Sequence, residues 1–497
     1  MKASLVVLAL TAAAATAFKF EGHRSESLQR KVTLKGLLRH TDNLQKFANR
    51  NNGTRVFGGK GHQLTVDYIH GIVKKAGYKV TLQEFSAPYS ETLSEKLTIN
   101  GKDYVIQAMT LTASTPKGGL TAPLVLVPNV TGEKGTAGCE DGDFAGLDLK
   151  GKIALVERGG CAFNIKSVNS AKLGAVATVV YNNAPGDFKG TLGAEATSKI
   201  ATGGISQESG KILIDLLKSG EVKATVDIAE LREDRKTYNV IAETKGGDPT
   251  KVIMLGAHTD SVRAGPGIND NGSGTAALLE VAYQLRHTKP KNKVRFGWWA
   301  AEEFGLLGSE HYVKNLKKTD IDNIAVILNF DMIASPNYII RTYNGDSSGS
   351  PIPAGSEVIT SLFENHFKAK HIIYESSVVP YSRTDVGPFA AVGIPSGGLD
   401  TGADEIKTPE QAKKFGGKAG EALDQCYHKA CDTTANLAHK AFLINARGIA
   451  HAVATYSHDV SSVSKARARK GKSVKREAVD LPVVSNNGSS GCSLPSI

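Results

Sequence analysis

The sequence predicts an α/β fold, in which a mostly parallel central sheet is covered by helices and interrupted by an inserted β-rich domain. Two observations indicate the sheet. Apolar runs such as residues 252–258 (VIMLGAH) are typical of strands buried on both faces, and they alternate with stretches of helical periodicity. A third observation indicates the insert, because between residues 118 and 232 the chain changes to short apolar runs separated by glycines.

Residues 1–17 have the pattern of a secretory signal peptide. Lys2 precedes an apolar segment, and Ala15 and Ala17 supply the small residues of a cleavage site. We therefore expect a secreted, extracellular protein. No later stretch reaches the roughly 18 consecutive apolar residues that a membrane-spanning helix needs, so we expect no membrane partner.

The main domain is expected over residues 51–117 and 233–460, on both sides of the insert at residues 118–232. Residues 18–50 precede it as either a pro-segment or a leading helix. The predicted helices are residues 63–78, which end at Gly77 as helices often do, and residues 274–286. The predicted strands are residues 79–85, 124–127, 152–157, 176–181, 252–258, 294–301 and 324–331.

The last segment, residues 461–497, is expected to be a basic, disordered tail. Residues 464–476 hold seven basic and no acidic side chains, and so contribute strongly to the formal net charge of +11. A charge run of this kind is usually solvated. We therefore expect no nucleic-acid partner, and the 41% hydrophobic and 22% charged composition is that of a soluble globular protein.

The five cysteines gain meaning from the expected export, because thiols tend to pair in an oxidising compartment. The economical pairings are Cys139 with Cys161 and Cys426 with Cys431, which leaves Cys492 without an assigned partner.

Export also makes N-glycosylation relevant. Asn52, Asn129 and Asn487 each begin an acceptor triplet. Asn271 begins one too, but it adjoins the site described next, so we expect it to carry no glycan.

Four polar residues lie where predicted strands end: His258, Glu302, Glu303 and Asp331. Two adjacent glutamates after an apolar strand need partners, since an uncompensated buried carboxylate is costly. Ligand sites in open α/β sheets lie at the carboxyl ends of the strands. Each residue alone has an ordinary explanation as a cap or a solvated side chain, but their joint placement favours a site.

Two further residues extend this group: Asp270, in a glycine-rich loop, and His428, between Cys426 and Cys431. Two imidazoles with several carboxylates suit zinc better than magnesium or calcium. A single catalytic zinc normally takes three protein ligands, and this group offers more, so two zinc ions are the better count.

The residues then divide by role. Asp270 is the candidate bridging ligand, with His258 and Asp331 on one ion and Glu303 and His428 on the other. Glu302 remains as a general base for a water molecule.

Two neighbours of the ligands have supporting roles. Asp260 is placed to orient His258, and Tyr427 could donate a hydrogen bond to an oxyanion. The short loop closed by Cys426 and Cys431 would hold Tyr427 and His428 in place.

At these residues the chain resembles the di-zinc aminopeptidases of the aminopeptidase Y and secreted leucine aminopeptidase 2 type. The resemblance rests on GAHTDSV, GPGINDNGSGT, WWAAEEFGLLGS, LNFDMI, TPEQ and CYHKAC, and it covers about residues 235–455. It implies a zinc-exopeptidase fold for the main domain and the ligand and catalytic roles given above. The insert is similar to a protease-associated domain.

The resemblance also implies a reaction: removal of the first residue, by preference leucine or another hydrophobic one, from peptides with a free N-terminus. We expect a monomer. Two departures concern substrate binding. Asp400 stands where such relatives commonly have phenylalanine, which suggests possible acceptance of basic residues, and residues 383–386 (RTDV) depart from the usual Arg-Ser-Asp followed by an aromatic residue.

Four alternatives remain open. Residues 345–349 (GDSSG) fit a serine-hydrolase elbow, but Pro351 and Pro353 follow where that motif needs a helix. A metal-free binding protein would lack these ligands. A carboxypeptidase or a glutaminyl cyclase could share the fold, although Asp270 and the disulfide-flanked His428 favour an aminopeptidase.

Overall fold

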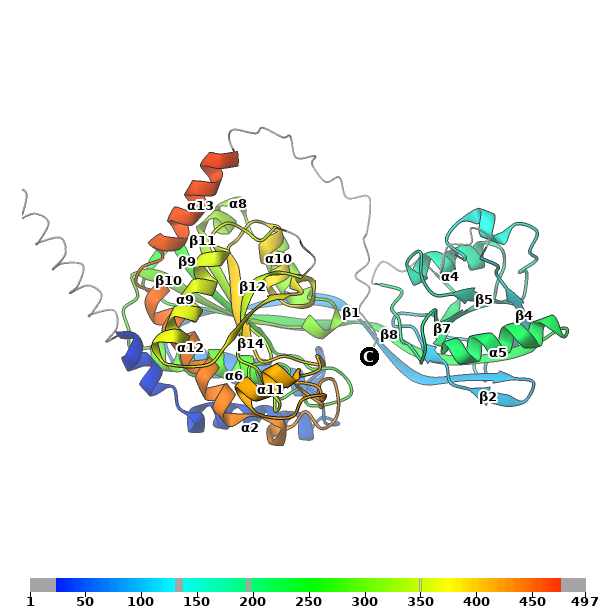
Figure 1. The fold of residues 1–497 in the computed structure, drawn as a ribbon, viewed down its shortest axis with the longest axis horizontal. Helices are drawn as coiled ribbons and strands as arrows, with labels where there is room; N and C mark the ends of the chain where they lie inside the picture. Colours follow the sequence, from blue (N-terminus) through cyan, green and yellow to red (C-terminus); the bar gives the residue numbers. More distant parts are fainter. Residues whose placement is uncertain (1–23, 130–136, 194–197, 348, 350, 475–497) are drawn as a thin grey trace, which may run out of the picture. The chain divides into compact units, whose positions relative to one another are not determined.

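The computed structural model describes residues 24–129, 137–193, 198–347, 349 and 351–474 (Figure 1). The signal peptide, Asn487 and Cys492 lie outside the described residues. The chain divides into a larger unit, Met1–Ala87 with Lys236–Leu481, and a smaller unit that includes Pro88–Arg235. Each unit has its own hydrophobic core and is described by itself.

The sheet of the larger unit is mostly parallel. Its strands are β9 (Asp248–His258), β10 (Asn292–Trp299), β11 (Ile324–Phe330), β12 (Arg341–Asp346), β13 (Glu375–Val379), β14 (Ser396–Asp400) and part of β8 (Lys223–Glu243). The strand order is β13-β12-β14-β11-β9-β10-β8. Strands β10, β9, β11 and β14 run parallel to one another, so their carboxyl ends meet at one edge of the sheet, whereas β8 and β12 on either side are antiparallel to them.

Helices cover both faces of this sheet. They are α2 (Leu34–Asn49), α3 (Lys60–Lys75), α6 (Gly272–Leu285), α7 (Leu307–Lys314), α8 (Lys318–Asn323), α9 (Ser356–Ala369), α10 (Val386–Ala391), α11 (Pro409–Phe415), α12 (His439–Tyr456) and α13 (Ser461–Val474). Successive side chains of β9 point to opposite faces of the sheet, which explains why apolar cores form on both faces. Leu255 packs with residues of α6 and α12, whereas Met254 belongs to the cluster on the other face.

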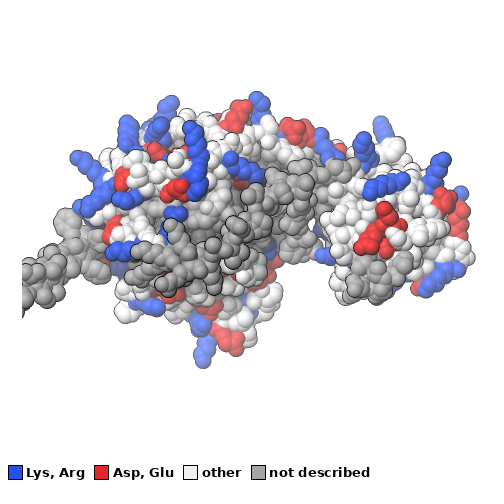
Figure 2. Space-filling view, turned by 90° about the horizontal axis from the view of Figure 1, so that it is seen from above, with Lys and Arg blue, Asp and Glu red and all other residues white. Residues whose placement is uncertain are grey.

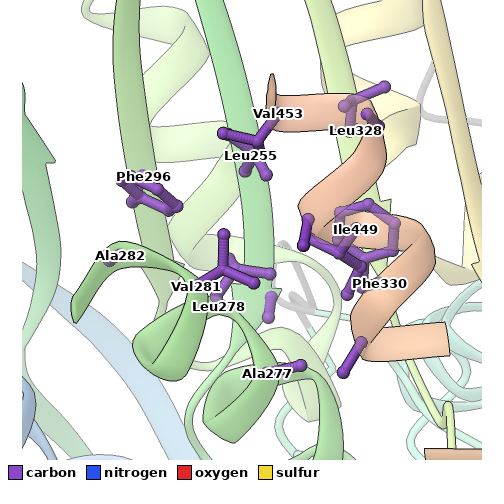
Figure 3. Packing of buried hydrophobic residues seen from close by; sticks show 14 of the residues in the cluster. Leu255, Ala277, Leu278, Val281, Ala282, Phe296, Leu328, Phe330, Ile449 and Val453 are labelled. Atoms are coloured by element: carbon purple, nitrogen blue, oxygen red, sulfur yellow. The ribbon is translucent and has the colours of Figure 1, made fainter. Parts of the chain in front are cut away.

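The main core lies between the sheet and helices α6 and α12 (Figure 3). Leu255 and Leu328 extend from the strands towards Leu278 of α6 and Ile449 of α12, and all four are buried. Burying a leucine-sized side chain contributes about 1.5–3 kcal/mol, so this layer fixes the strands whose ends carry the polar residues.

Helix α2 belongs to the same core. Leu37 and Leu44 are buried in the main cluster together with Leu28 and Val32, and the hydroxyl of Thr33 caps the helix by accepting from Gly36 N. Residues 34–49 therefore form a helix packed into the larger unit, and the two alternatives for residues 18–50 both stay predictions.

The smaller unit contains β2 (Lys102–Tyr104), β3 (Gln107–Ala108), β4 (Leu120–Leu126), β5 (Ile153–Glu157), β6 (Ala177–Tyr181), β7 (Ala201–Ile205), α4 (Phe163–Lys172) and α5 (Gln207–Lys218). Strands β4 to β7 are parallel. Its two helices were not predicted for a β-rich insert. A disulfide joins Cys139 to Cys161, as expected.

The smaller unit includes residues from Pro88 onwards, which precede the insert predicted at residues 118–232, and the bounds of the insert stay a prediction. The first of these residues belong to strand β1 (Lys79–Ile99), which continues well beyond the predicted residue 85 and pairs with β2 and β8. Leu97 and Ile99, near its end, are buried in the core of the smaller unit. A continuous strand has no local sequence signal where one core ends and another begins.

The prediction of a disordered tail is wrong for residues 461–474, which form α13. Val460 and Val463 are buried against the larger unit, and Nη1 of Arg467 donates to the carbonyl of Ile324 at 3.3 Å. Alanine, lysine and arginine are strong helix formers, so two apolar anchors suffice to dock this basic segment. Residues 475–497 lie outside the described part.

On the face shown in Figure 2, Lys and Arg side chains are interspersed with Asp and Glu side chains over the described residues. The positive charge is therefore not gathered into one area of that face. Within the described ranges, every helix is too short or too polar to span a bilayer.

Candidate metal centre

The predicted site residues meet at the carboxyl edge of the sheet. Strand β9 ends at His258, β10 is followed by Glu302 and Glu303, and Asp331 comes directly after β11. These strands are hydrogen-bonded neighbours, so the tight packing of their apolar runs places the polar residues side by side.

Strained backbone directs several of these side chains. Ala301, which precedes the glutamates, has φ 58°, Met332, which follows Asp331, has φ 49°, and His428 itself has φ 55°. Non-glycine residues rarely adopt this left-handed region. Such strain clusters at functional sites, because the surrounding structure must hold it in place.

Asp270 lies between the two histidines. Its Oδ1 is 3.2 Å from Nε2 of His258, and its Oδ2 is 3.2 Å from Nε2 of His428. The two oxygens of one carboxylate thus face two different imidazoles. This is the arrangement that a bridging ligand requires.

The other carboxylates surround the same two imidazoles. Nε2 of His258 lies 3.5 Å from Oδ1 of Asp331 and 3.7 Å from Oε2 of Glu302. Nε2 of His428 lies 3.0 Å from Oε2 of Glu303. The structure therefore brings together His258, Glu302, Glu303, Asp331 and His428 around Asp270.

The donor set fits metal ions. Ligand atoms of His258, Asp270 and Glu303 all lie within 4.8 Å of one another, and so do those of His258, Glu302 and Asp331. Buried atoms without a hydrogen-bond partner include both ring nitrogens of His258, Oε1 of Glu303 and Oδ1 of Asp331. Orphaned polar atoms of this kind are costly unless a cation binds them, and mixed imidazole and carboxylate ligands suit zinc.

The electrostatics of the site are those of crowded carboxylates. Burial, together with the charges of Asp331 and Glu303, raises the pKa of Glu302 well above its usual value. Burial opposes a charge on His428, but Glu303 and Asp270 outweigh it and raise the pKa of His428 to about 11. Both pKa shifts arise because several carboxylates crowd one buried site. Bound metal ions would compensate this negative charge.

Asp260 lies behind His258, as predicted. Its Oδ1 is 3.6 Å from Nδ1 of His258 and accepts from the backbone N–H of Glu302 at 3.1 Å. One buried carboxylate thus contacts both the proposed ligand and the backbone of the proposed base.

The disulfide between Cys426 and Cys431 closes the loop that carries Tyr427 and His428. The ring of Tyr427 stacks on that of His428 with centroids 3.8 Å apart. Nη2 of Arg383 donates to the hydroxyl of Tyr427 at 3.2 Å.

Arg55 is a residue that no sequence motif indicates. Its buried guanidinium donates to the carbonyl of Pro266 at 2.8 Å and to the carbonyls of Thr259 and Gly267. It thereby ties the end of β9 to the turn before Asp270. It lies in a loop without a motif, and only the tertiary structure reveals its role.

Asp400 is not a free acidic group. Its Oδ1 accepts from Nε of Arg341 at 2.7 Å and from Nη2 at 2.6 Å, and that guanidinium also contacts Glu405 at 3.0 Å. Strands β12 and β14 place Arg341 directly opposite Asp400. The sequence departure at Asp400 is thus matched by a charge partner in the fold.

Two other sequence expectations concern side chains at or near the site. Asn271 is buried, donates to the carbonyl of Phe330 and accepts from Gly274 N, which agrees with its exclusion as a glycan acceptor. The stretch around Ser347 lacks a direct strand-to-helix turn, because β12 ends at Asp346 and α9 begins at Ser356. This argues against a nucleophile elbow.

Two of the other predicted glycan acceptors, Asn52 and Asn129, lie within the described residues. Asn52 is exposed with φ 57°, and the amide of Asn129 donates to Oε2 of Glu157 at 3.4 Å. Glycosylation of either side chain stays a prediction.

The open α/β sheet and its cluster of imidazoles and carboxylates define a metal-dependent hydrolase. Residues 239–453 match peptidase family M28, and residues 120–213 match the PA domain. The chain is 43% identical over 438 residues to leucine aminopeptidase 2 of Trichophyton rubrum, covering 88% of this chain and 86% of that protein. It is 44% identical over 436 residues to the corresponding protein of Arthroderma otae, with coverage of 87% and 86%. The chain therefore belongs to peptidase family M28.

Solved structures agree with this assignment. An aminopeptidase from Aneurinibacillus sp. strain AM-1 has a TM-score of 0.70 at 27% identity, covering 89% of this chain and 96% of that one. BSAP, a zinc aminopeptidase from Bacillus subtilis, has a TM-score of 0.62 at 24% identity, with coverage of 84% and 94%, and supports the fold alone.

Proposed function

We propose that this metallo-aminopeptidase holds two zinc ions and removes N-terminal residues, by preference leucine and other hydrophobic ones, from peptides outside the cell. The observation that carries the proposal is the position of Asp270, whose two oxygens each lie 3.2 Å from a different imidazole. A single ion would explain the placement of only one of these two imidazoles beside Asp270.

The ligands divide into two sets around Asp270. His258 and Asp331, at adjacent strand ends, would hold one ion. Glu303 and His428, 3.0 Å apart, would hold the other. Zinc held by these residues would polarise the scissile carbonyl and would make a water molecule more acidic.

Glu302 is the proposed general base. Its carboxylate lies beside His258 but is not needed to complete either ligand set. It would take a proton from the attacking water and pass it to the leaving amine. Asp260 supports this role, because its carboxylate accepts a hydrogen bond from the backbone N–H of Glu302 and so fixes the position of that residue.

Tyr427 is the proposed donor to the developing oxyanion. Burial and the carboxylates of Asp270 and Glu303 raise its pKa, so the hydroxyl keeps its proton at neutral pH. Such a donor is most effective when its position is fixed before the reaction. The disulfide and the stacking on His428 both restrict the Tyr427 ring.

The pairing of Asp400 bears on substrate preference. A free carboxylate near the site would attract a basic first residue, but this one is already hydrogen-bonded to Arg341. We therefore favour hydrophobic over basic first residues. The relatives named leucine aminopeptidase 2 support the same preference.

Metal analysis combined with an aminoacyl-anilide panel tests the proposal. We expect two zinc ions per chain, loss of activity with a chelator, and faster turnover of Leu-anilide than of Lys-anilide. An N-acetylated leucyl-anilide serves as the control for the free amine. One ion per chain, or turnover of the acetylated substrate, would contradict the proposal. Carboxypeptidase activity on a longer peptide, judged by end-group analysis, would favour the alternative with the same fold.

A further inference from the structure

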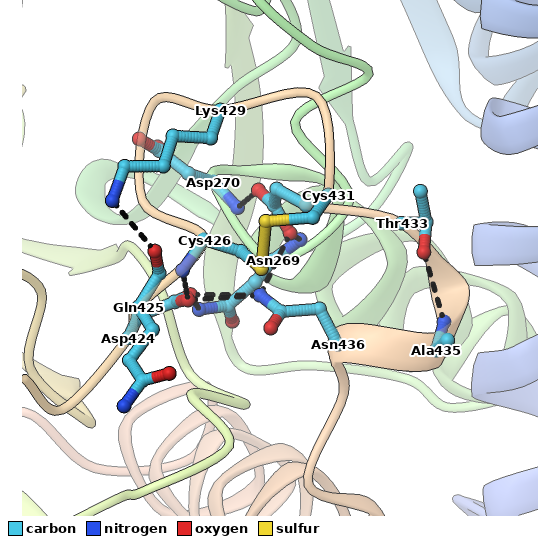
Figure 4. Close-up of a disulfide and its surroundings, with 11 residues drawn as sticks. Asn269, Asp270, Asp424, Gln425, Cys426, Lys429, Cys431, Thr433, Ala435 and Asn436 are labelled. Carbon is cyan, nitrogen blue, oxygen red and sulfur yellow. Dashed lines mark hydrogen bonds between the residues drawn. A yellow bond between two sulfur atoms is a disulfide. The ribbon is translucent and has the colours of Figure 1, made fainter.

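A buried polar network surrounds the Cys426–Cys431 disulfide and the backbone next to Asp270 (Figure 4). It consists of Asn269, Asp424, Asp432 and Asn436, each of which is at most 8% exposed. None of these four is a proposed metal ligand. Their hydrogen bonds nevertheless reach all three loops in which Asp270, Asp331 and His428 lie.

Asp432 is the member of the network that accepts a hydrogen bond from the backbone of the proposed bridging ligand. Its Oδ1 accepts from the backbone N–H of Asn269 at 2.8 Å, and its Oδ2 accepts from the backbone N–H of Asp270 at 3.0 Å. The carbonyl of Asp432 also accepts from Ile268 N at 3.0 Å. Three consecutive residues that end at Asp270 are thus fixed by one residue.

Asp432 follows the disulfide loop directly, since Cys431 precedes it and His428 is four residues earlier. The Cys426–Cys431 bond limits the movement of His428 relative to Asp432. The hydrogen bond of the Asp432 carboxylate therefore fixes the backbone of Asp270 relative to the loop that carries His428.

Asp424 and Asn269 complete the connection to the third loop. Oδ2 of Asp424 accepts from Nδ2 of Asn269 at 2.7 Å, and Oδ1 accepts from Cys426 N at 2.8 Å. Nδ2 of Asn269 also donates to Ser335 Oγ at 3.1 Å, and its Oδ1 accepts from Ala334 N at 3.1 Å. Ala334 and Ser335 belong to the loop that begins with Asp331.

We propose that Asp432 is a positioning residue of the metal centre, which fixes the bridging Asp270 to the loop that carries His428. The proposal rests on the proposed function, because it assumes that Asp270 and His428 bind zinc. Groups that orient metal ligands through hydrogen bonds typically change metal affinity about 10–100-fold when they are substituted. Buried hydrogen-bonded carboxylates are well suited to this task, because a charged acceptor binds backbone N–H groups strongly.

The test is Asp432→Asn, which keeps the size of the side chain but turns one acceptor oxygen into a donor that opposes a backbone N–H. Zinc affinity is measured by competition with a chromogenic chelator, and kcat and KM are measured at several buffered free-zinc concentrations. We expect zinc affinity to fall about 10-fold or more. We also expect kcat to recover as free zinc is raised while KM stays unchanged, which a general loss of structure would not produce.

Asp248→Asn is the matched control. Asp248 also accepts from a backbone N–H, that of Thr250 at 2.9 Å, but it lies at the opposite end of β9 from His258. We expect its zinc affinity to equal that of the wild type. Equal zinc affinities for Asp432→Asn and the wild type would overturn the inference. A wild-type chain that binds no zinc would instead contradict the proposed function.

A second variant covers the case in which Asp432→Asn is not recovered folded, as judged by thermal unfolding of the zinc-free protein. Asn436→Ala keeps the carboxylate but removes the amide that donates to Oδ1 of Asp432 at 3.2 Å and to both oxygens of Asp424. We expect a smaller fall in zinc affinity in the same direction. Unchanged affinity would count against the network as a positioning device.

Discussion

Arg383 and Tyr427 are joined by a hydrogen bond whose direction is fixed by chemistry. The guanidinium Nη2 of Arg383 lies 3.2 Å from the hydroxyl of Tyr427. Arginine has no acceptor, so the tyrosine oxygen accepts and its own proton stays available for another partner. A hydroxyl held in this way beside His428 is a preorganised donor.

Replacement of Tyr427 by phenylalanine tests this donor. The ring can still stack on His428, so we expect zinc content to stay unchanged. Without the hydroxyl proton, we expect kcat for Leu-anilide to fall about 10²–10³-fold, as when one oxyanion donor is removed from other enzymes. Steady-state kinetics with metal analysis measure both quantities. Tyr104→Phe, in the smaller unit, is the control, and a kcat within twofold or so of the wild type would exclude the donor role.

Glu302→Gln separates proton transfer from metal binding. The amide cannot take a proton from water, so we expect turnover to fall by at least about 10². Both proposed ligand sets lack Glu302, so we expect the variant to keep two zinc ions. Glu310→Gln, at an exposed glutamate of α7 that pairs with Lys314, is the matched control. Near-normal turnover, or loss of an ion, would mean that Glu302 has another role.

Asp400→Asn tests whether the acidic residue at the end of β14 selects the substrate. Because Arg341 already occupies Asp400 through hydrogen bonds, we expect the ratio of kcat/KM for Lys-anilide to that for Leu-anilide to stay unchanged. Asn can still accept a hydrogen bond from Arg341, which limits the effect on folding. A clear fall in the ratio would show that Asp400 recognises basic residues, as its sequence context first suggested.

The sheet and the site were predictable because they follow from local patterns. Apolar runs identify β9, β10 and β11, and His258, Glu302 and Asp331 stand where these runs end. Parallel strands bring such ends to one edge, so adjacency in space follows from position in the sequence. The structure adds the distances that make Asp270 the connecting residue.

What escaped prediction depends on tertiary contacts. Nothing near Arg55 in the sequence indicates that its guanidinium will be buried against carbonyl groups around Asp270. Asp424 and Asp432 flank the disulfide loop, and this position could have indicated a role near the site. Their hydrogen bonds to residue 269, however, join segments more than 150 residues apart, which the sequence does not show. Helix α13 was not predicted because its composition is basic, and only the structure shows that Val460 and Val463 are buried and dock it on the larger unit.

A histidine pair remote from the metal centre predicts how stability depends on pH. The rings of His366 in α9 and His451 in α12 stack with centroids 4.2 Å apart. Burial, with a contribution from Lys370, lowers the pKa of His366 to about 4. Burial, with contributions from His366 and Lys370, lowers that of His451 to about 3.

The remaining groups around the pair leave these shifts in place. Nδ1 of His451 shares a hydrogen bond with Ser25 Oγ at 2.8 Å. Lys370, the nearby cation, is paired with Glu26 at 3.0 Å. The pair is therefore neutral in the folded protein, whereas both rings titrate near their ordinary value of 6.5 in the unfolded chain.

Because the folded pKa values lie below 6.5, the unfolded chain binds more protons under acidic conditions. The contribution of the pair to stability is therefore complete above about pH 6.5 and is lost as the pH falls towards about 4. Between about pH 7 and about pH 5, each histidine should cost on the order of 2 kcal/mol of unfolding free energy. We expect His451→Asn, in which the amide can still bond to Ser25, to lose less stability over this range than the wild type. Chemical unfolding of both proteins at the two pH values measures the difference. His439→Asn, at an exposed histidine, is the control. Identical pH dependence of the unfolding free energy for His451→Asn and the wild type would show that the pair is not the acid-sensitive element.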